Sequence, residues 1–448
     1  MDASIRQNGV EMRRRNKRAC LSNPQIGETG RPLPPNEPSQ QFHETPWLVV
    51  VSVTLLFVLA TTSIVADILF NVNYVGPDFT SFYYACRAAS LGADFYDVGV
   101  LRRLADQDGL AGVLPFLYPP VFPYLFMELA RLQVSTAQLV WSWAGIAAFC
   151  GATVMAVVGI RRRQILLGIV PVSWPLAMSL GLGLAMGLNL PCSVAMGQVN
   201  LFVLLLVLPI LILPEESRHW ASALMALAIL IKVTPIFLLL VFLAARRYRS
   251  VGRSCLWMGV WVACSLVRGA WTSWIAFFRF LPETSYGQAV PGLFRASALS
   301  NFSVAGFFSR LTDSPNSTFV LTCLTMALLA VPVLYRARNC HGIDNAGVML
   351  SAYILVLIGS PLTYLHHVIM VLPMLLWFSA TYLSSGSTKT TAGLALGIIA
   401  GTDFPVLYGR LGASPTTSVA SSLNLYALLG LYALGLMRAQ REPAPGIG

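Results

Sequence analysis

The chain has 448 residues, of which 56% are hydrophobic and 11% are charged, and its formal net charge is +11. Soluble domains carry about 25% charged residues, so this composition excludes an ordinary soluble protein and indicates that most side chains face lipid or one another. Helices and closed barrels are the structures that satisfy backbone hydrogen bonds inside a bilayer. Because the apolar runs are continuous and do not alternate, we predict an all-α polytopic membrane protein.

Residues 1–45 form a basic, polar tail before the first apolar segment. Its charge has two interpretations: a patch that binds nucleic acid or a lipid surface, and a cytoplasmic anchor that follows the positive-inside rule. We favour the anchor, and the Pro, Asn, Gln and Gly content predicts disorder. The cationic residues of this tail are Arg6, Arg13, Arg14, Arg15, Lys17, Arg18 and Arg31.

Apolar segments then follow one another through residues 46–440, and they predict about twelve transmembrane helices, since a bilayer core takes about 20 apolar residues per helix. Residues 441–448 are predicted to be a cytoplasmic tail. The segments lie at 47–70, 116–132, 137–160, 165–186, 199–214, 219–245, 254–270, 317–335, 346–363, 367–383, 391–409 and 421–437.

The arginine triplet at 161–163 conflicts with the positive-inside rule on this twelve-span map. A second map removes the conflict by making 116–132 a re-entrant segment and breaking 219–245 into a hairpin at Lys232–Pro235. We favour twelve spans, because orientation depends on a sum over all loops. Both maps place the two long intervening segments, 71–115 and 271–316, on the same external side.

These two external segments are predicted to be ordered loops with short interfacial helices, because they contain Arg, Tyr, Pro and acidic residues rather than linker sequence. In the first of them, Thr80–Leu91 and Val98–Asp106 have helix-like spacing of apolar residues. Prolines and polar breaks are frequent in the apolar segments, and such breaks line cavities or protein interiors rather than lipid. We therefore expect a polar cleft that opens to the external side.

Ionisable residues near the membrane are few, and they are the first candidates for function. Asp78 follows the first apolar segment directly and has two interpretations. It could be a general base that takes a proton from a hydroxyl group, or an N-cap that accepts a backbone hydrogen bond. The other ionisable candidates at or near membrane depth are Asp67, Glu128, Lys232, Arg268, His366, His367 and Asp403.

Lys232 lies within an apolar segment, three residues before Pro235. It is either a counter-ion for a phosphate group or a lysine that snorkels from a helix kink, and we favour the first. The neighbouring polar motif Gly197-Gln-Val-Asn200 precedes a leucine-rich segment, where Asn200 could cap a helix.

The adjacent pair His366–His367 could donate hydrogen bonds to a phosphate or hydroxyl group, or could be structural. A zinc site needs three or four ligands, and the remaining histidines lack ligand spacing, so we reject zinc. The eight cysteines are scattered without a CxxC pair, which indicates small core residues. We predict no metal and no other cofactor.

Six short motifs occur in a fixed order along the chain. They are Asp-Phe-x-x-x-Tyr at 78–83, Gly-x-Asp-x-Tyr-Asp at 92–97, Tyr-Pro-Pro at 118–120, Gly-Gln-Val-Asn at 197–200, Lys-x-x-Pro at 232–235 and Ser-Pro-Leu-Thr-Tyr-Leu-His-His at 360–367. In this order they resemble glycosyltransferase family 87, which contains membrane mannosyl- and arabinofuranosyltransferases of the GT-C superfamily. The resemblance covers roughly residues 47–440 and implies a GT-C-type fold with external loops that carry juxtamembrane helices.

The resemblance also implies roles for particular residues. Asp78 matches the catalytic base of the first external loop, and Lys232 with His367 or His366 would bind the donor phosphate. Arg279 and Arg295 are weaker candidates in the second external loop. Predicted substrate-binding residues are Tyr83, Tyr84, Arg87, Tyr96, Tyr118 and Asn301.

The implied function is transfer of a sugar, mannose or arabinofuranose-like, from a polyprenyl-phosphate donor to a lipid or glycan acceptor, without a metal. The expected mechanism is an inverting single displacement on the external face of a bacterial plasma membrane, with the N-terminus in the cytoplasm. No nucleic-acid partner or obligate protein partner is predicted. The alternatives are a transporter or lipid-linked-sugar flippase, and a non-catalytic membrane scaffold.

Overall fold

The computed structural model describes residues 75–438 except 111, 167–170, 213–217, 289–294, 313, 340–345, 386–387 and 402–421. The described residues belong to one compact unit, Val50–Gly448. All their regular secondary structure is helical, with no strand in these ranges, which confirms the all-α prediction. The predictions for the tail 1–45, the first apolar segment 47–70, Asp67, Asp403 and the tail 441–448 lie outside the described residues.

Three described helices are long and apolar enough to cross a membrane: α6 (Val134–Leu166), α12 (Tyr248–Val267) and α15 (Pro315–Asn339). Large apolar side chains project from the two later helices, such as Leu256 on α12 and Leu328 on α15, which are 66% and 73% exposed. Such surfaces are unfavourable in water and suit contact with lipid tails. The shorter apolar helices are α7 (Trp174–Gly187), α9 (Asn200–Ile212), α10 (Arg218–Ile231), α11 (Phe237–Ala244), α16 (Ala346–Ile358), α17 (Leu372–Ser385), α18 (Thr388–Gly401) and α20 (Leu423–Arg438).

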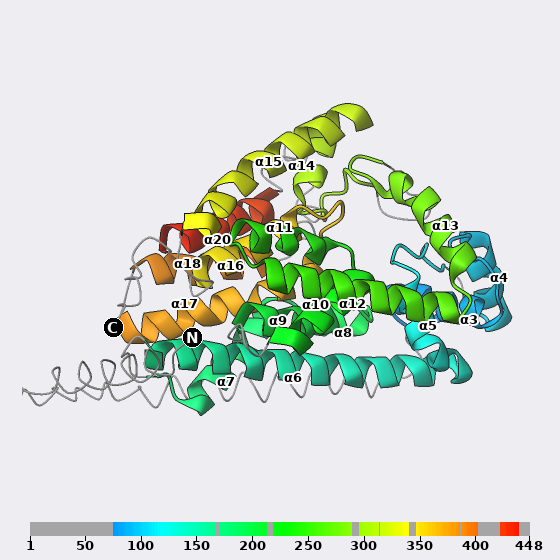
Figure 1. Cartoon of the computed structure of the whole chain (residues 1–448), viewed down its shortest axis with the longest axis horizontal. Helices are drawn as coiled ribbons and strands as arrows, with labels where there is room; N and C mark the ends of the chain where they lie inside the picture. The colour runs from blue at the N-terminus through cyan, green and yellow to red at the C-terminus, as the bar shows by residue number, and fades with distance from the viewer. Residues whose placement is uncertain are drawn as a thin grey trace, which may run out of the picture. The chain divides into compact units, whose positions relative to one another are not determined.

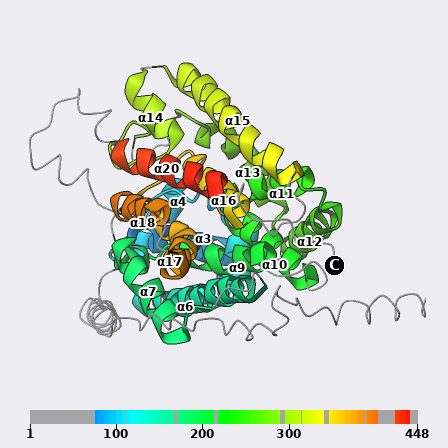
Figure 2. The same ribbon diagram turned by 90° about the vertical axis from the view of Figure 1, so that its left-hand side faces the viewer.

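Two groups of helices pack side by side in the described unit (Figure 1). In the first group α9 lies between α6 and α10, and α12 covers α10. In the second group α20 packs against both α16 and α18, as the turned view shows (Figure 2). The 3-10 helix η5 (Leu365–Val371) contacts α9 of the first group and α16, α17 and α18 of the second, so it lies where the two groups meet.

Two predicted spans have a different structure. Residues 116–132 contain the six-residue helix α5 (Val121–Phe126) and the 3-10 helix η1 (Met127–Arg131), which are too short to cross a bilayer. Pro119, Pro120 and Pro123 explain the shortness, because proline removes a backbone donor and restricts the preceding residue. The single spanning helix that the twelve-span map predicts for 116–132 is therefore wrong, and the re-entrant alternative stays a prediction.

The segment 219–245 is also interrupted. α10 ends at Ile231, and the single 3-10 turn η3 (Thr234–Ile236) separates it from α11. Pro235 lies in this turn and has no N–H to continue the helical ladder. A break in the helix therefore lies at Lys232–Pro235 and brings Lys232 out of regular helix, while the hairpin of the second map stays a prediction.

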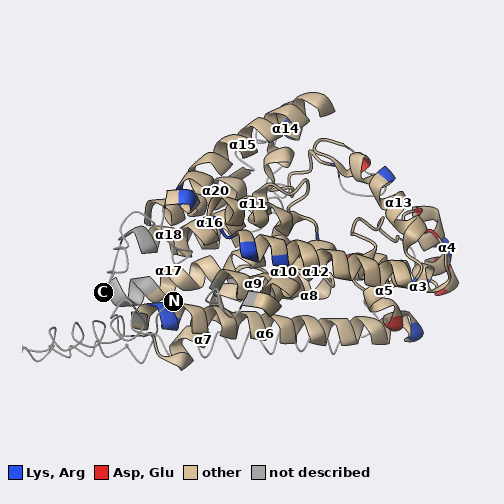
Figure 3. Cartoon of the chain, in the orientation of Figure 1, with Lys and Arg blue, Asp and Glu red and all other residues tan. Residues whose placement is uncertain are grey.

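The two external segments have the predicted short helices and contact each other. The first contains α3 (Pro77–Ser90) and α4 (Val98–Gln107), and the second contains α13 (Trp271–Phe280), the 3-10 turn η4 (Leu281–Thr284) and α14 (Val304–Leu311). The ring of Tyr96 packs on Phe277 and Phe280 of α13, with centroid distances of 6.0 and 5.7 Å. The described acidic residues all lie in these loops or in η1 (Figure 3). The side of the membrane on which the loops lie stays a prediction.

Candidate active site

Asp78 lies in the first turn of α3 and does not cap it. The N-cap is Gly76, Pro77 begins the helix, and no side chain caps this end, so the N-cap interpretation of Asp78 is wrong. A carboxylate in the first turn is still favoured by the helix dipole. Gly76 is required at this position, because a Cβ atom there would lie 2.3 Å from the carbonyl oxygen of Ala195.

The start of α3 is fixed against a turn that links the short helix α8 (Leu190–Ala195) to α9. The backbone N–H of Phe79 donates to the carbonyl of Met196 at 3.1 Å, and the indole of Trp141 on α6 donates to the carbonyl of Gly197 at 2.8 Å. Gly197 has φ +73°, and a Cβ atom there would lie 2.5 Å from the Cβ of Phe79. Only glycine fits this close approach, so the motif that begins at Gly197 is held directly beside Asp78.

Two amide side chains of that motif connect Asp78 with Lys232. Gln198 Nε2 donates to Asp78 Oδ2, Asn200 Nδ2 donates to Gln198 Oε1 at 3.2 Å, and Lys232 Nζ donates to Asn200 Oδ1 at 2.8 Å. Gln198, Asn200 and Lys232 are all buried. We call these four side chains the amide chain. The break after α10 lets Lys232 reach it, and in the described ranges no carboxylate lies within ion-pair distance of Lys232.

The two histidines lie at the same place, in η5. The carbonyl of His366 accepts hydrogen bonds from Ser193 Oγ at 2.8 Å and from Asn200 Nδ2 at 3.5 Å. The ring of His367 is buried, and its centroid is 4.4 Å from that of the His366 ring. Both rings are close enough to Lys232 to interact with its charge. The structure therefore brings together Asp78, Lys232 and the histidine pair, as the sequence motifs predict.

The electrostatic environment of Asp78 suits a base. Burial raises the pKa of this carboxyl to about 6, and the hydrogen bond from Gln198 and the charge of Lys232 act in the opposite direction. A carboxylate with this pKa is ionised at neutral pH and is a stronger base than an exposed aspartate. Tyr118 and Tyr364 are also near enough to interact with the Asp78 charge, and Tyr364 belongs to the same motif as the histidines.

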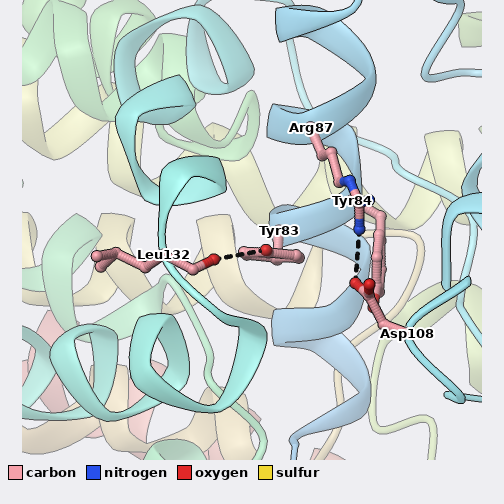
Figure 4. Close-up of polar contacts among 5 residues, drawn as sticks. All are labelled: Tyr83, Tyr84, Arg87, Asp108 and Leu132. Atoms are coloured by element: carbon pink, nitrogen blue, oxygen red, sulfur yellow. Dashed lines mark hydrogen bonds and ion pairs between the residues drawn. The ribbon is translucent and has the colours of Figure 1, made fainter.

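Three predicted substrate-binding residues on α3 have protein partners for their polar atoms (Figure 4). The hydroxyl of Tyr83 donates to the carbonyl of Leu132 at 2.7 Å. Tyr84 and Arg87 both donate to Asp108 Oδ2, at 3.0 and 2.6 Å. Tyr84 has no exposed surface, so this contact holds α3 to the end of α4. These residues stabilise the loop that carries Asp78, and direct contact with substrate stays a prediction.

The other predicted substrate-binding residues also make structural contacts. The hydroxyl of Tyr96 donates to the carbonyl of Tyr118 at 2.7 Å, and the Tyr118 ring packs edge-on against Phe82. Tyr118 is thus positioned beside Asp78 by the first external loop itself. Asn301 is fully buried. It accepts from the N–H groups of Ser303 and Thr363 and donates to the carbonyls of Ala296 and Pro361.

Asn301 uses its hydrogen-bonding capacity to tie the second external loop to the segment that precedes the histidine pair. Tyr286 adds a further tie, because its hydroxyl donates to the carbonyl of Gly359 at 2.6 Å. The loop therefore helps to place η5, which gives Asn301 a clear structural role. The weaker candidates Arg279 and Arg295 are on the same loop, where Arg295 is exposed.

The remaining ionisable candidates lie away from the amide chain. Glu128 pairs with Arg131 at 2.9 Å, and both side chains are exposed, while Arg268 donates to the carbonyl of Tyr124 at 2.5 Å. Across the described ranges no group of three His, Cys, Asp or Glu side chains could hold a metal ion.

Sequence reasoning misses the role of Gln198 and Asn200. The sequence marks both as polar amides before a leucine-rich segment and suggests a helix cap for Asn200. The structure shows instead that Asn200 is the first residue of α9 and that its side chain bonds to Lys232 and Gln198. The signal in the sequence is the unusual polarity of Gly-Gln-Val-Asn beside an apolar run. Which groups the two amide side chains reach depends on tertiary packing.

Comparison with known proteins agrees with these motifs. A polyprenol-phosphate-mannose-dependent alpha-(1-2)-phosphatidylinositol pentamannoside mannosyltransferase of Mycolicibacterium smegmatis is 29% identical over 308 residues, which cover 64% of this chain and 70% of the relative. A polyprenol-phosphate-mannose-dependent alpha-(1-2)-phosphatidylinositol mannoside mannosyltransferase of Mycobacterium tuberculosis is 26% identical over 342 residues, covering 72% and 75%.

The profile of glycosyltransferase family 87 matches residues 116–361. This range includes the Gly197–Asn200 motif and Lys232, and along the sequence it lies between Asp78 and the histidine pair. The match spans more than half of the chain, and the fold is that of a helical membrane protein. The chain is a membrane glycosyltransferase and belongs to glycosyltransferase family 87.

Proposed function

We propose that this enzyme transfers mannose from a polyprenyl-phosphate mannose donor to a hydroxyl group of a mannosylated phosphatidylinositol lipid. The sugar and the acceptor class come from the relatives, which are named as polyprenol-phosphate-mannose-dependent mannosyltransferases acting on phosphatidylinositol mannosides. Mannose is preferred to arabinofuranose because both of these relatives are named for it. The proposed location of the site is the external face of the plasma membrane, where the two loop segments meet.

In the proposed reaction Asp78 is the general base. Its carboxylate takes the proton from the acceptor hydroxyl while that oxygen forms a bond to the anomeric carbon. The bond between the anomeric carbon and the phosphate oxygen breaks, and its electron pair leaves with polyprenyl phosphate. The outcome is inversion at the anomeric carbon, and the proton passes from Asp78 to water after product release. Phosphate is a good leaving group, so no general acid is needed.

Lys232 and the histidine pair would bind the donor phosphate. A lysine side chain offers a point charge and three donors to phosphate oxygens, and this one lacks a direct carboxylate partner within the described ranges. The polyprenyl chain would remain in lipid beside the apolar helices. The donor would thus be held by its phosphate with the anomeric carbon directed toward Asp78.

The observation that supports this proposal most strongly is the amide chain itself. It holds a candidate base and a candidate phosphate-binding cation at a fixed separation, bridged by Gln198 and Asn200. A scaffold has no need for a base beside a buried lysine, whereas a transferase that uses a phosphate leaving group needs both groups. The family match favours a transferase over a transporter.

The test uses purified enzyme in vesicles with polyprenyl-phosphate mannose, polyprenyl-phosphate arabinofuranose and polyprenyl-phosphate glucose, each with and without a phosphatidylinositol mannoside. We expect release of polyprenyl phosphate only with the mannose donor and the mannoside together, and a product that carries one more mannose. If polyprenyl phosphate is released from the arabinofuranose or glucose donor and not from the mannose donor, the proposed donor sugar is wrong. If the mannose donor turns over and no mannoside gains a mannose, the proposed acceptor is wrong.

A further inference from the structure

Gln198 and Asn200 form a fixed, directional bridge between the base and the cation. Lysine can only donate hydrogen bonds, so the oxygen of Asn200 faces Lys232 and the amide nitrogen faces Gln198. The oxygen of Gln198 must then accept, which turns its nitrogen toward Asp78. The orientation of each amide therefore follows from that of its neighbour. At the end of the chain, the amide nitrogen of Gln198 donates to Oδ2 of Asp78, which accepts this bond when Asp78 is ionised.

We infer that Gln198 and Asn200 are positioning residues of the transferase, with Gln198 holding Asp78 in its ionised form and Asn200 holding Lys232 toward the donor phosphate. This inference rests on the proposed function, because it assigns roles relative to that base and that phosphate. Neither residue need contact substrate.

The geometry supports separate roles for the two amides. Gln198 binds Oδ2 of Asp78, and no other side-chain partner of this carboxylate occurs in the described ranges, so Oδ1 is available to take the acceptor proton. Protonation at Oδ2 would place two hydrogens face to face and break the bond. Asn200, by contrast, reaches Lys232 and also the backbone of His366, so it joins the two groups assigned to the donor phosphate.

The backbone around the bridge prevents its collapse. Gly197 is fixed by the bond from Trp141, and Phe79 is bonded to Met196, so Gln198 and Asp78 cannot move apart without breaking backbone contacts. Both amide side chains are buried, 3% and 0% exposed, and buried hydrogen bonds to a charged group are stronger than exposed neutral ones.

Other titratable groups act on Asp78 and must be considered in a pH experiment. Those that interact with its charge are Lys232, Tyr118 and Tyr364. Burial raises the pKa of both tyrosines, so they stay neutral at the pH values that matter for Asp78. The other charged groups on the elements packed against α3 all retain solvent contact. They are Arg102, Arg103 and Asp106 on α4, Glu128 and Arg131 on η1, and Arg161, Arg162 and Arg163 on α6.

The test compares three nearly isosteric side chains at one position through the dependence of kcat/KM on pH. Gln198→Met removes the donor to Asp78. The acid limb, which is the fall of kcat/KM at low pH, should therefore move up by roughly one to two pH units, the shift that corresponds to the free energy of a hydrogen bond to a charged group. Gln198→Glu keeps an oxygen for Asn200 but places a second carboxylate beside Asp78, so the limb should move up further. The expected order from low to high pH is wild type, Met, Glu.

Gln164 provides the matched control. It is a buried glutamine of α6 that donates to the carbonyl of Ala380 and accepts from the N–H of Val172. Gln164→Met removes a comparable pair of hydrogen bonds, and it should lower thermal stability without moving the acid limb. An unchanged limb in both Gln198 variants, or an equal shift in Gln164→Met, would overturn the role of Gln198.

Asn200 is tested by the KM for the donor. Asn200→Leu leaves Lys232 without its acceptor and should raise that KM about tenfold, while Asn200→Asp keeps an acceptor and should retain most of the affinity. Equal KM values in these two variants would overturn the role of Asn200. Asp78→Asn, measured in parallel, separates the two claims: turnover there contradicts the proposed base, whereas an inactive Asp78→Asn with unshifted Gln198 variants contradicts only the positioning role.

Discussion

The backbone N–H of Tyr364 donates a hydrogen bond to Nδ1 of His367 at 2.8 Å. Since a backbone N–H cannot accept, Nδ1 carries no proton, and the neutral ring must carry its proton on Nε2. The bond also fixes the plane of the ring at the start of η5. His367 is therefore prepared to donate a hydrogen bond through Nε2, which is what a ligand to phosphate oxygens requires.

His367→Gln should retain part of the donor affinity, because the amide nitrogen of glutamine can take the place of Nε2–H. His367→Ala should raise the KM for polyprenyl-phosphate mannose by about tenfold, corresponding to roughly 1.4 kcal/mol, and leave the KM for the acceptor unchanged. Steady-state kinetics with each substrate varied in turn measures both values. A larger effect on the acceptor KM would mean that His367 binds the acceptor rather than the donor phosphate.

Gly197→Ala should lower kcat about 100-fold. The new Cβ would lie 2.5 Å from the Cβ of Phe79, at a φ of +73° that favours glycine, so the first turn of α3 must move away from Gln198. A displacement of about 1 Å at a catalytic group costs this much. Gly252→Ala on α12 is the control, because a Cβ atom added there would meet no atom within 4 Å, and wild-type kcat is expected for it.

Tyr84→Phe distinguishes structural contact from substrate contact on α3. The variant keeps the buried ring and loses one hydrogen bond to Asp108, so the free energy of unfolding should fall by about 1 kcal/mol, with KM values within about twofold of wild type. Thermal unfolding in detergent and steady-state kinetics measure the two quantities. A tenfold rise in KM without loss of stability would instead support direct contact between Tyr84 and substrate.

The pH dependence of wild-type turnover follows from the pKa of Asp78. Burial raises that pKa to about 6, and the base must be ionised to accept a proton. We therefore expect kcat/KM to rise as the pH increases through about 6 and to level off above about 7. The same raised pKa means that the native state holds this proton more tightly than the unfolded chain, so this group lowers stability as the pH rises from about 4 to 6. A flat profile between pH 5 and 7 would contradict the assignment.

Much of the site can be predicted from sequence, because ionisable residues are rare in an apolar chain and therefore easily noticed. Asp78, Lys232 and the histidine pair are found this way, and the helical spacing of apolar residues predicts α3 and α4 to within a few residues. The break at Lys232–Pro235 can also be proposed, since a proline removes a backbone donor and disfavours continued helix, although Pro209 and Pro332 lie inside the unbroken helices α9 and α15.

The remaining features depend on tertiary contacts. Asp78 is an equally good N-cap in sequence, and only the docking of Gly76 against Ala195 shows that the helix begins before it. Residues 116–132 are apolar enough for a span, yet three prolines and the packing of α5 against α3 make them short helices. The sequence suggests a substrate-binding role for Asn301, and its four hydrogen bonds to backbone groups become visible only in the folded chain.

The most direct test of the central claim is the turnover of Asp78→Asn in vesicles that contain polyprenyl-phosphate mannose and a phosphatidylinositol mannoside. Asparagine preserves the size of the side chain and cannot accept the proton of a hydroxyl group. We predict that release of polyprenyl phosphate falls at least about 1000-fold, on the order of the contribution of a general base, while the thermal unfolding temperature is not lowered. Turnover within about tenfold of wild type in the folded variant would contradict the assignment of Asp78 as the catalytic base.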